Sequence, residues 1–296
     1  MHRRIAVLIA VAAAAAAVPG VAAAAASPHY YLALGDSLSQ GMQPNVKGVT
    51  VDTDQGYAND IAQAEQARVR NLQLVKLGCG GETTTSMLTG KGNETNARKL
   101  HCDKAGGSQL TAAVRFLKAH HRAGEVPLIT IDIGANDVDG CVTSANVDGC
   151  VAAGVANIGR NVPKILKALR KAAPSGTTIA DMTLYDPILG YYFSANATDR
   201  ALASASTVLL KDVNDELTVA DGKAGVKTAD VADAFDSYDS TQMVSWEGQS
   251  IPINVATVCA WTWACQTPPT GPNIHANLDG YEVIAGAFEK VIGRLH

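Results

Sequence analysis

Ser37 lies in the stretch Gly35-Asp36-Ser37, which follows an apolar run at residues 31–34 without a spacer. A serine hydroxyl is a weak nucleophile, but a base that accepts its proton allows it to attack a carbonyl carbon. A simpler interpretation is that Asp36 and Ser37 only cap the helix that follows, since both residue types are favoured at helix N-termini. The first interpretation requires a base and donors for an oxyanion elsewhere in the chain.

Three other segments contain residues that could complete such a site. Ser37 and Gly81 could each supply a backbone N–H, because glycine lets the backbone approach a ligand closely. Asn136 could supply a side-chain NH₂, and His275, at the start of the C-terminal helical stretch, is the candidate base. Each has an ordinary interpretation as well: Gly80 and Gly81 could form only a turn, Asn136 an Asx-turn, and a lone histidine is usually a surface or core residue. The sequence around Ser37 lacks the Gly-x-Ser-x-Gly pattern of the α/β-hydrolase nucleophile elbow.

Short apolar runs rich in β-branched residues alternate with helical patterns along the chain. Such runs are typical of strands that are buried on both faces, so the pattern predicts an α/β fold with a parallel sheet covered by helices. The expected strands are residues 30–34, 72–77, 127–134, 177–186 and 225–235, and the expected helices include residues 109–121, 154–173 and 196–222.

Glycines and small polar residues follow the first three expected strands. The stretch after the first is Gly35-Asp36-Ser37, the stretch after the second is GCGGETTTS, and the stretch after the third is GANDV. In open α/β sheets, ligands bind beyond the carboxyl ends of the strands. The three stretches are therefore expected to meet at one site, in which Asp36 and Asp137 are structural acceptors.

Four blocks of the sequence resemble, in the right order, the motifs of the SGNH or GDSL hydrolases. They are GDSLSQG (35–41), GCGGETT (78–84), IGANDV (133–138) and HANLDGY (275–281), the last with alanine where the family pattern has proline. The resemblance implies a three-layer α/β/α, flavodoxin-like fold with about five parallel strands, and the hydrolysis of carboxylic esters. It also implies that Ser37 is the nucleophile and His275 the base. The oxyanion donors that it implies are the N–H groups of Ser37 and Gly81 and the side chain of Asn136.

The sequence departs from the family pattern at position 272. The family usually carries Asp-x-x-His, in which the aspartate orients the histidine, but here Pro272 lies three residues before His275. Because a backbone carbonyl can also accept the Nδ1–H of a histidine, we expect the carbonyl of Pro272 to orient His275 in a Ser–His dyad. Some secreted actinobacterial lipases of the family are thought to use such a dyad, and this chain resembles them. Asp279 is the alternative acceptor, although it lies four residues after His275.

Residues 1–26 have the layout of a secretory signal peptide. Arg3 and Arg4 precede an apolar run, and small residues follow it. The run is short for a membrane span, which needs about 20 residues; an uncleaved N-terminal anchor is the alternative. We therefore expect an extracellular protein whose mature chain, residues 27–296, forms one hydrolase domain without a membrane span.

Six cysteines in an exported chain indicate disulfide bonds. Many pairings are possible in principle, and we expect the local one because each bond then closes a short segment. The expected bonds are Cys79–Cys102, Cys141–Cys150 and Cys259–Cys265. A zinc site is the competing interpretation, but the chain has no CxxC pair, so we expect no metal.

The charge of the chain indicates which kinds of binding partner are to be expected. Residues 1–26 hold two of the 24 basic residues and none of the 28 acidic ones, so the mature chain has a formal net charge of −6. There is no basic run and no interleaving of basic with aromatic residues, which argues against binding to nucleic acid or to an anionic membrane. We expect a monomer that needs no cofactor and binds a small-molecule or lipid ester. The alternatives are a polysaccharide O-deacetylase with the same machinery and, from another class, a non-catalytic secreted binding protein.

Two aromatic clusters are candidates for the wall of an acyl pocket. Trp261 and Trp263 lie between Cys259 and Cys265, shortly before His275 in sequence. A second cluster, residues 191–193, follows the fourth expected strand. Ordinary packing is the competing interpretation, because large aromatic side chains dominate protein cores.

Overall fold

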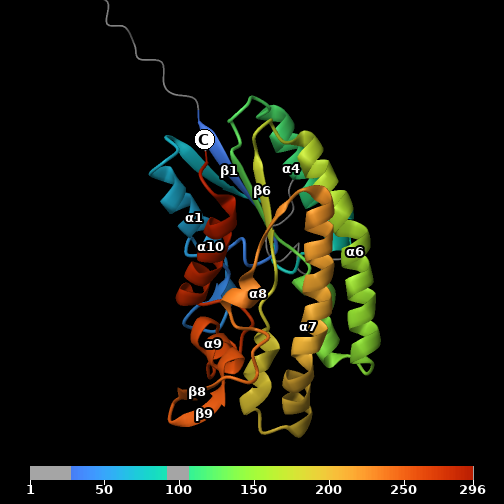
Figure 1. Ribbon diagram of the computed structural model, residues 1–296, viewed down its shortest axis with the longest axis vertical. Helices are drawn as coiled ribbons and strands as arrows, with labels where there is room; N and C mark the ends of the chain where they lie inside the picture. Colours follow the sequence, from blue (N-terminus) through green and yellow to red (C-terminus); the bar gives the residue numbers. More distant parts are fainter. Residues whose placement is uncertain (1–27, 92–106, 296) are drawn as a thin grey trace, which may run out of the picture.

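The computed structural model describes residues 28–91 and 107–295. Its centre is a sheet of five parallel strands in the order β4-β1-β5-β6-β7 (Figure 1). This order is that of flavodoxin-like folds. The strands are β1 (His29–Gly35), β4 (Leu72–Lys76), β5 (Leu128–Asp132), β6 (Thr178–Met182) and β7 (Lys227–Ala229). The predicted α/β fold with a parallel sheet is confirmed.

Helices cover both faces of the sheet and give the expected three layers. On one face α1 packs against α10, and on the other face α6 packs against α7, α4 and α2 (Figure 1). The bounds are α1 (Tyr57–Gln66), α2 (Thr84–Thr89), α4 (Gln109–Ala119), α6 (Val147–Ala172), α7 (Ala197–Ala224) and α10 (Leu278–Ile292). The shorter elements are β2 (Gln43–Pro44), β3 (Thr50–Val51), α5 (Ala135–Val138), η1 (Asp139–Thr143), η2 (Pro187–Phe193), α8 (Val231–Ala234), β8 (Met243–Trp246), β9 (Gln249–Pro252) and α9 (Ile253–Trp261).

Apolar strands place the sheet in the core. All five residues of β5 are buried, as are residues 31–34 of β1. On the α1–α10 face, the rings of Tyr57 and Phe288 stack with centroids 5.0 Å apart. The hydroxyl of Tyr281 on α10 donates to the carbonyl of Met42 at 2.9 Å. This hydrogen bond joins the last helix to the segment that follows the first strand.

Two predicted boundaries were wrong. The strand expected at 225–235 ends at Ala229, because the side chain of Asp230 accepts from the N–H of Asp233 and begins α8. The C-terminal helix begins at Leu278 and not at His275, because Asn277 caps it by accepting from the N–H of Gly280 at 3.0 Å. His275 therefore lies in the loop before the helix.

Two of the three predicted disulfide bonds are confirmed. Cys141 is bonded to Cys150, and Cys259 to Cys265. Cys79 is also disulfide-bonded, but Cys102, its predicted partner, lies outside the described residues. The proposed signal peptide at residues 1–26 lies outside them too.

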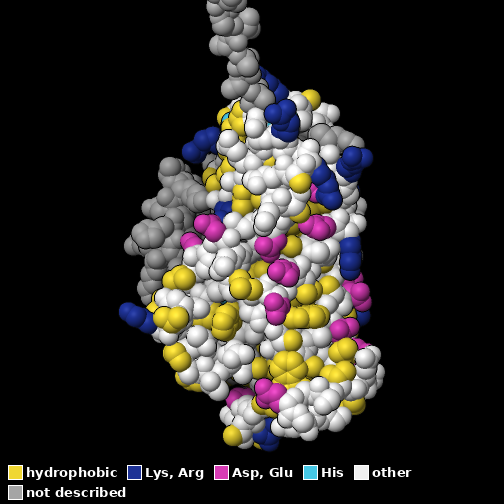
Figure 2. Space-filling view, turned by 90° about the vertical axis from the view of Figure 1, so that its left-hand side faces the viewer, with side chains coloured by type: hydrophobic (Ala, Val, Ile, Leu, Met, Phe, Trp, Pro, Cys, Tyr) yellow, Lys and Arg dark blue, Asp and Glu magenta, His cyan; other side chains and the backbone are white. Residues whose placement is uncertain are grey.

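Figure 2 shows the face of the molecule that is formed by α1 and α10. Lys and Arg side chains gather mainly at the upper end, where β1 begins, and hydrophobic side chains are most frequent in the lower half (Figures 1 and 2). Val46, Ile274 and Leu278 are among the large apolar side chains that are exposed. No helix in the described part of the chain is long and apolar enough to cross a membrane.

Candidate active site

The end of β1, which lies very close to β5, positions the first residues of the site. Gly35 ends β1 with a φ of +126°, and a Cβ at this position would lie 2.1 Å from the carbonyl oxygen of Asp132. Only glycine fits both conditions. The Gln109 side chain fixes this end of β1, since it accepts from the N–H of Gly35 and donates to its carbonyl, both at 2.8 Å. Ser37 is thereby held two residues beyond the strand.

The carboxylate of Asp36 connects the first and third strand ends. It accepts from the N–H of Leu38 at 3.0 Å and from the Asn136 side-chain NH₂ at 2.9 Å. The Ser37 hydroxyl lies 3.4 Å from Asp36 Oδ1, which is a weak hydrogen bond. Asp36 thus orients the amide of Asn136 and keeps it next to Ser37. The expectation that Asp36 is a structural acceptor agrees with these contacts.

Asp132 lies beneath Asp36 and was missed in the sequence. Its carboxylate accepts from the N–H of Asp36 at 3.1 Å and from the Tyr57 hydroxyl at 2.5 Å. Burial raises the pKa of both carboxyls, and the charge of Asp36 raises the pKa of Asp132 further, well above its ordinary value. Burial therefore favours the protonated form of this pair. A single acid at the end of a mostly apolar, buried strand, as in residues 128–132, is the sequence signal that could have identified it.

Asp137 ties the third strand end to the second. Its two carboxylate oxygens accept from the N–H and the hydroxyl of Thr84, both at 2.7 Å. Gly81 lies nearby in a turn in which the N–H of Glu82 donates to the carbonyl of Cys79 at 3.0 Å, and its φ is +75°. This turn requires glycine at position 81. Gly81 is not among the residues that line the cavity described below, so its oxyanion role stays a prediction.

His275 is oriented by a different group from the one expected. Its Nδ1 lies 2.6 Å from Oδ1 of Asn273, and no hydrogen bond from the ring to the Pro272 carbonyl is found among the described residues. The prediction for Pro272 is therefore corrected to the side chain of Asn273. Asp279, the other candidate, is exposed in the first turn of α10. A short polar side chain two residues before a histidine can fold back as an Asx-turn, which is the signal that the sequence contained.

The contacts of Asn273 determine the tautomer of His275. The backbone N–H of His275 can only donate, and it points at Asn273 Oδ1 at 3.0 Å, so this atom must be oxygen. Asn273 Nδ2 donates to the Thr50 hydroxyl at 2.9 Å, which agrees with that orientation. The Nδ1 of His275 must then carry the proton, and Nε2 has a free lone pair. This is the tautomer that a general base for Ser37 needs.

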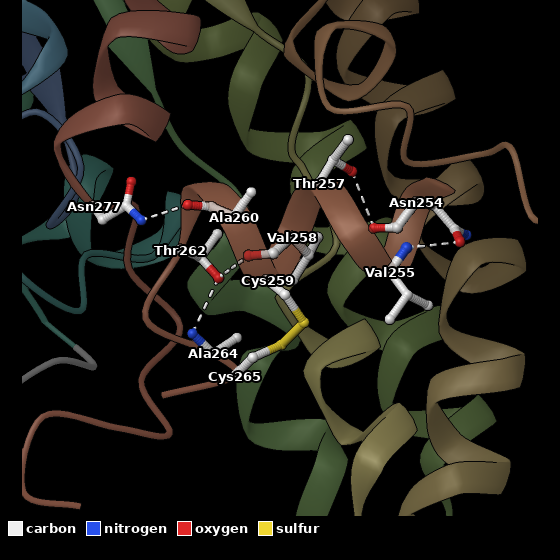
Figure 3. The surroundings of a disulfide bond; sticks show 10 residues. All are labelled: Asn254, Val255, Thr257, Val258, Cys259, Ala260, Thr262, Ala264, Cys265 and Asn277. Atoms are coloured by element: carbon white, nitrogen blue, oxygen red, sulfur yellow. Dashed lines mark hydrogen bonds between the residues drawn. A yellow bond between two sulfur atoms is a disulfide. The ribbon is translucent and has the colours of Figure 1, made fainter. Parts of the chain in front are cut away.

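The segment that contains His275 pairs with the loop that the Cys259–Cys265 disulfide closes. Figure 3 shows this disulfide. The N–H of Trp263 donates to the carbonyl of His275, and the N–H of Asn273 donates to the carbonyl of Trp263, both at 3.0 Å. The Asn277 side chain donates to the carbonyl of Ala260 at 2.7 Å (Figure 3). These bonds give the loop before α10 a fixed backbone conformation.

Ser37, Asn136 and His275 line one cavity of about 110 Å³, so the structure brings these three predicted residues together. No hydrogen bond joins Ser37 to His275 in the described residues; such bonds are often long in enzymes without substrate. The other walls are mostly aliphatic and come from α6, α7 and the segments before them. Examples are Val151, Leu210 and Val213, whereas neither of the two predicted aromatic clusters lines the cavity.

We expect Asn273→Asp to shift the pH dependence of the reaction. Burial lowers the pKa of His275 to about 4, and the neutral amide of Asn273 brings no negative charge to offset this effect. An aspartate at the same place would raise that pKa. The acid limb of kcat/KM is therefore expected near pH 4 in the wild type and about one to two pH units higher in the variant.

The measurement is a pH–rate profile from pH 3.5 to 8 with one uncharged ester. Asn45→Asp is the matched control, because Asn45 Oδ1 only accepts hydrogen bonds, from Lys47 and Val49, and aspartate keeps them. Equal acid limbs in Asn273→Asp and the wild type would show that Asn273 does not orient the base.

The sequence and the fold both match known proteins. The family model described as GDSL-like Lipase/Acylhydrolase matches residues 31–288. None of the curated proteins matches the sequence. The fold is similar to that of an extracellular lipase from Streptomyces rimosus, with 15% identity, a TM-score of 0.54 and coverage of 89% of this chain and 99% of that one.

Two further solved structures have a similar fold. A putative GDSL-like lipase from Parabacteroides merdae has 12% identity and a TM-score of 0.50, with 89% of this chain and 95% of that chain covered. A single-residue variant of the acetyl xylan esterase Axe2 from Geobacillus stearothermophilus has 15% identity and a TM-score of 0.50, with 90% and 95% covered. The family model spans most of the chain and includes all the residues of the cavity that were predicted from the motifs. The chain therefore belongs to the GDSL-like lipase/acylhydrolase family and is a carboxylic ester hydrolase.

Proposed function

We propose that this protein is a secreted esterase or lipase in which Ser37 is the nucleophile and His275 the base. The observation that carries the proposal is the fixed tautomer of His275: Asn273 accepts from Nδ1, so Nε2 is left to accept a proton in the cavity that Ser37 also lines. The orienting group in this proposal is the Asn273 amide, so the serine and histidine act without a carboxylate partner.

The reaction has two halves. Ser37 Oγ attacks the ester carbonyl while His275 Nε2 accepts the hydroxyl proton, and His275 then protonates the leaving alcohol. A water molecule repeats the sequence on the acyl-enzyme and releases the acid. The Asn136 NH₂ group and the backbone N–H groups of Ser37 and Gly81 are the proposed donors to the oxyanion. Asp36 supports Asn136 in that role by fixing its amide at 2.9 Å.

The walls of the cavity favour an acyl chain over a sugar. Val138, Val151 and Leu210 are aliphatic, and no Trp lines the cavity in the described residues. Sugar sites usually present polar groups and aromatic faces, whereas aliphatic walls stabilise methylene groups by removing them from water. We therefore place acyl-ester hydrolysis before the removal of acetyl groups from a polysaccharide.

Secretion is part of the proposal. The signal-peptide layout of residues 1–26 supports it, and so do the Cys141–Cys150 and Cys259–Cys265 bonds, because disulfides persist mainly in oxidising compartments.

Hydrolysis of p-nitrophenyl esters from C2 to C16 tests the proposal. Each buried methylene contributes about 0.8 kcal/mol, so the butyrate ester should exceed the acetate ester about tenfold in kcat/KM. A fluorophosphonate probe should also label Ser37, as peptide mass spectrometry would show, and heat-denatured protein should remain unlabelled. An optimum at C2 would favour the deacetylase instead. Absence of both hydrolysis and labelling would overturn the proposal.

A further inference from the structure

The cavity beside Ser37 has an uneven distribution of charge. Three carboxyl groups line it, those of Asp36, Asp139 and Asp186, and none of the described residues that line it is Lys or Arg. The rest of the wall is mostly aliphatic, so little in it screens these groups. A substrate that enters the cavity therefore meets a negative potential close to the reacting carbonyl.

Two of the three carboxyls are already engaged by the protein. Asp36 accepts from Leu38 and Asn136, as described above. Asp186 accepts from the N–H of Ile188 at 3.1 Å and from the Ser206 hydroxyl at 2.8 Å. Both therefore have structural roles at the ends of β1 and β6.

Asp139 has no such role. It begins η1, directly after the segment that contains Asn136, and its carboxyl makes no hydrogen bond or ion pair with any described residue. It is only partly buried, so a molecule in the cavity can reach it. A carboxyl that lies in an apolar wall without a partner loses hydration and gains nothing from the protein in return.

The surroundings of Asp139 determine when it is charged. Burial raises its pKa to about 7, and the nearby charges of Asp36 and Asp137 contribute to this rise. Tyr185, Asp186 and His275 are the other titratable groups that line the cavity. Burial raises the pKa of Tyr185 well above its ordinary value, raises that of Asp186 to about 6 and lowers that of His275 to about 4. Between pH 5.5 and 8, Asp139 therefore gains its charge while His275 stays neutral.

We propose that the free carboxylate of Asp139 makes the cavity select esters that carry a positive charge near the reacting carbonyl over neutral or anionic esters of the same shape. This inference rests on the proposed function, since it names the substrate class of the same site. A cation at this place would give Asp139 the partner that the protein does not provide. Anionic esters are repelled by Asp139, because no Lys or Arg lines the described wall and His275 stays neutral in this pH range.

Two isosteric pairs of esters test the selection. The first varies the alcohol: butyrylcholine against 3,3-dimethylbutyl butyrate. The second varies the acyl group: the p-nitrophenyl esters of 4-(trimethylammonio)butyrate and of 5,5-dimethylhexanoate. At pH 8 and low salt, we expect the cationic member of at least one pair to have a kcat/KM on the order of tenfold higher. The ratio should fall as the pH is lowered to 5.5.

Asp139→Asn should lower that ratio at pH 8 several-fold, toward one, because the Asp36 and Asp186 carboxyls that remain already have hydrogen-bond partners in the protein. Asp148→Asn is the matched control: it removes the same charge from an exposed position near the start of α6, outside the cavity, and should keep the wild-type ratio. The comparison uses the ratio of kcat/KM for the two esters of a pair. An effect of the substitution on folding or on the shared chemical step changes both values equally and cancels in this ratio. A ratio near one in both wild-type pairs, or a ratio that survives in Asp139→Asn, would overturn the inference.

A binding measurement separates this inference from the proposed function. Calorimetry of butyltrimethylammonium with Ser37→Ala needs no turnover, and the double variant Ser37→Ala/Asp139→Asn should bind it about tenfold more weakly. Equal binding by both would overturn the role of Asp139. Loss of binding with Asp139→Asn in a protein that hydrolyses no ester would instead overturn only the proposed function.

Discussion

Replacing Ser37 with alanine is expected to abolish ester hydrolysis, with a loss of about 10⁴- to 10⁶-fold in kcat. No other hydroxyl of Ser or Thr lines the cavity next to Asn136 and His275 in the described chain, apart from that of Ser206, which is hydrogen-bonded to Asp186. The measurement is kcat for p-nitrophenyl butyrate. For the variant, release of p-nitrophenol is followed until each enzyme molecule could have turned over once. Labelling by the fluorophosphonate probe should disappear in parallel.

The variant should fold normally, which makes a loss of activity interpretable. Among the described residues, the Ser37 hydroxyl makes only the 3.4 Å contact with Asp36, so its removal takes away no strong hydrogen bond. Unfolding curves in urea should therefore match those of the wild type. Ser204→Ala, which makes the same change on the exposed side of α7, is the control that keeps activity. If Ser37→Ala retained more than a few per cent of kcat, another group would be the nucleophile.

The protein is expected to lose stability as the pH rises from 4 to 7, because of a second pair of buried carboxyls. Asp181 on β6 and Asp221 on α7 are fully buried. Within the part of the chain that the structure describes, Asp181 Oδ2 and Asp221 Oδ1 have no hydrogen-bond partner other than the opposite carboxyl. Burial raises the pKa of Asp181 well above its ordinary value, and raises that of Asp221 from 3.8 to about 7. The folded state therefore binds more protons than the unfolded state between these two pH values.

The sign and the size of the effect follow from that difference. The stabilising proton is fully present below pH 4 and is lost as the pH rises through 7, which lowers the free energy of unfolding by up to about 4 kcal/mol. In Asp221→Asn the amide can donate to the Asp181 carboxylate, so the share of the loss that this pair causes should disappear and the stability should fall less steeply with pH. Asp212→Asn, an exposed change on the same helix, should keep the wild-type slope. Urea unfolding at pH 5, 6, 7 and 8 measures the free energy of unfolding at each pH. If this free energy fell equally steeply with pH in Asp221→Asn and in the wild type, the Asp181–Asp221 pair would not be the cause.

The central strands could be predicted, because burial on both faces of the sheet alone determines their apolar pattern. Residues 31–34 form a continuous apolar run and residues 128–131 a mostly apolar one, because parallel strands are covered on both faces. The end of the last strand was predicted less well. The expected range, 225–235, includes Asp230, which caps α8, and the sequence alone does not show that the backbone changes from strand to helix at this residue. The Cys141–Cys150 and Cys259–Cys265 bonds were predictable because each closes a short segment.

The site could be predicted only in part, for a related reason. Ser37, Asn136 and His275 follow from motifs that occupy strand ends and the last loop. Asn273 was not predicted, because the backbone must turn before its amide can reach Nδ1 of His275. The walls of the cavity come from α6 and α7, and which side chains two packed helices direct into one space depends on their relative rotation. The free carboxyl of Asp139 could be identified only after that packing was known.

The hydrogen bond between Tyr281 and Met42 joins the two ends of the folded chain next to the cavity. Ser37 follows the first strand of the sheet, whereas His275 comes just before the last helix. During synthesis, the nucleophile is therefore made long before the base, and an N-terminal fragment that ends before residue 275 lacks the base. With the proposed roles, the nascent chain stays inactive until its final helix has left the ribosome and packed against α1, so that hydrolytic activity begins only after the fold is complete.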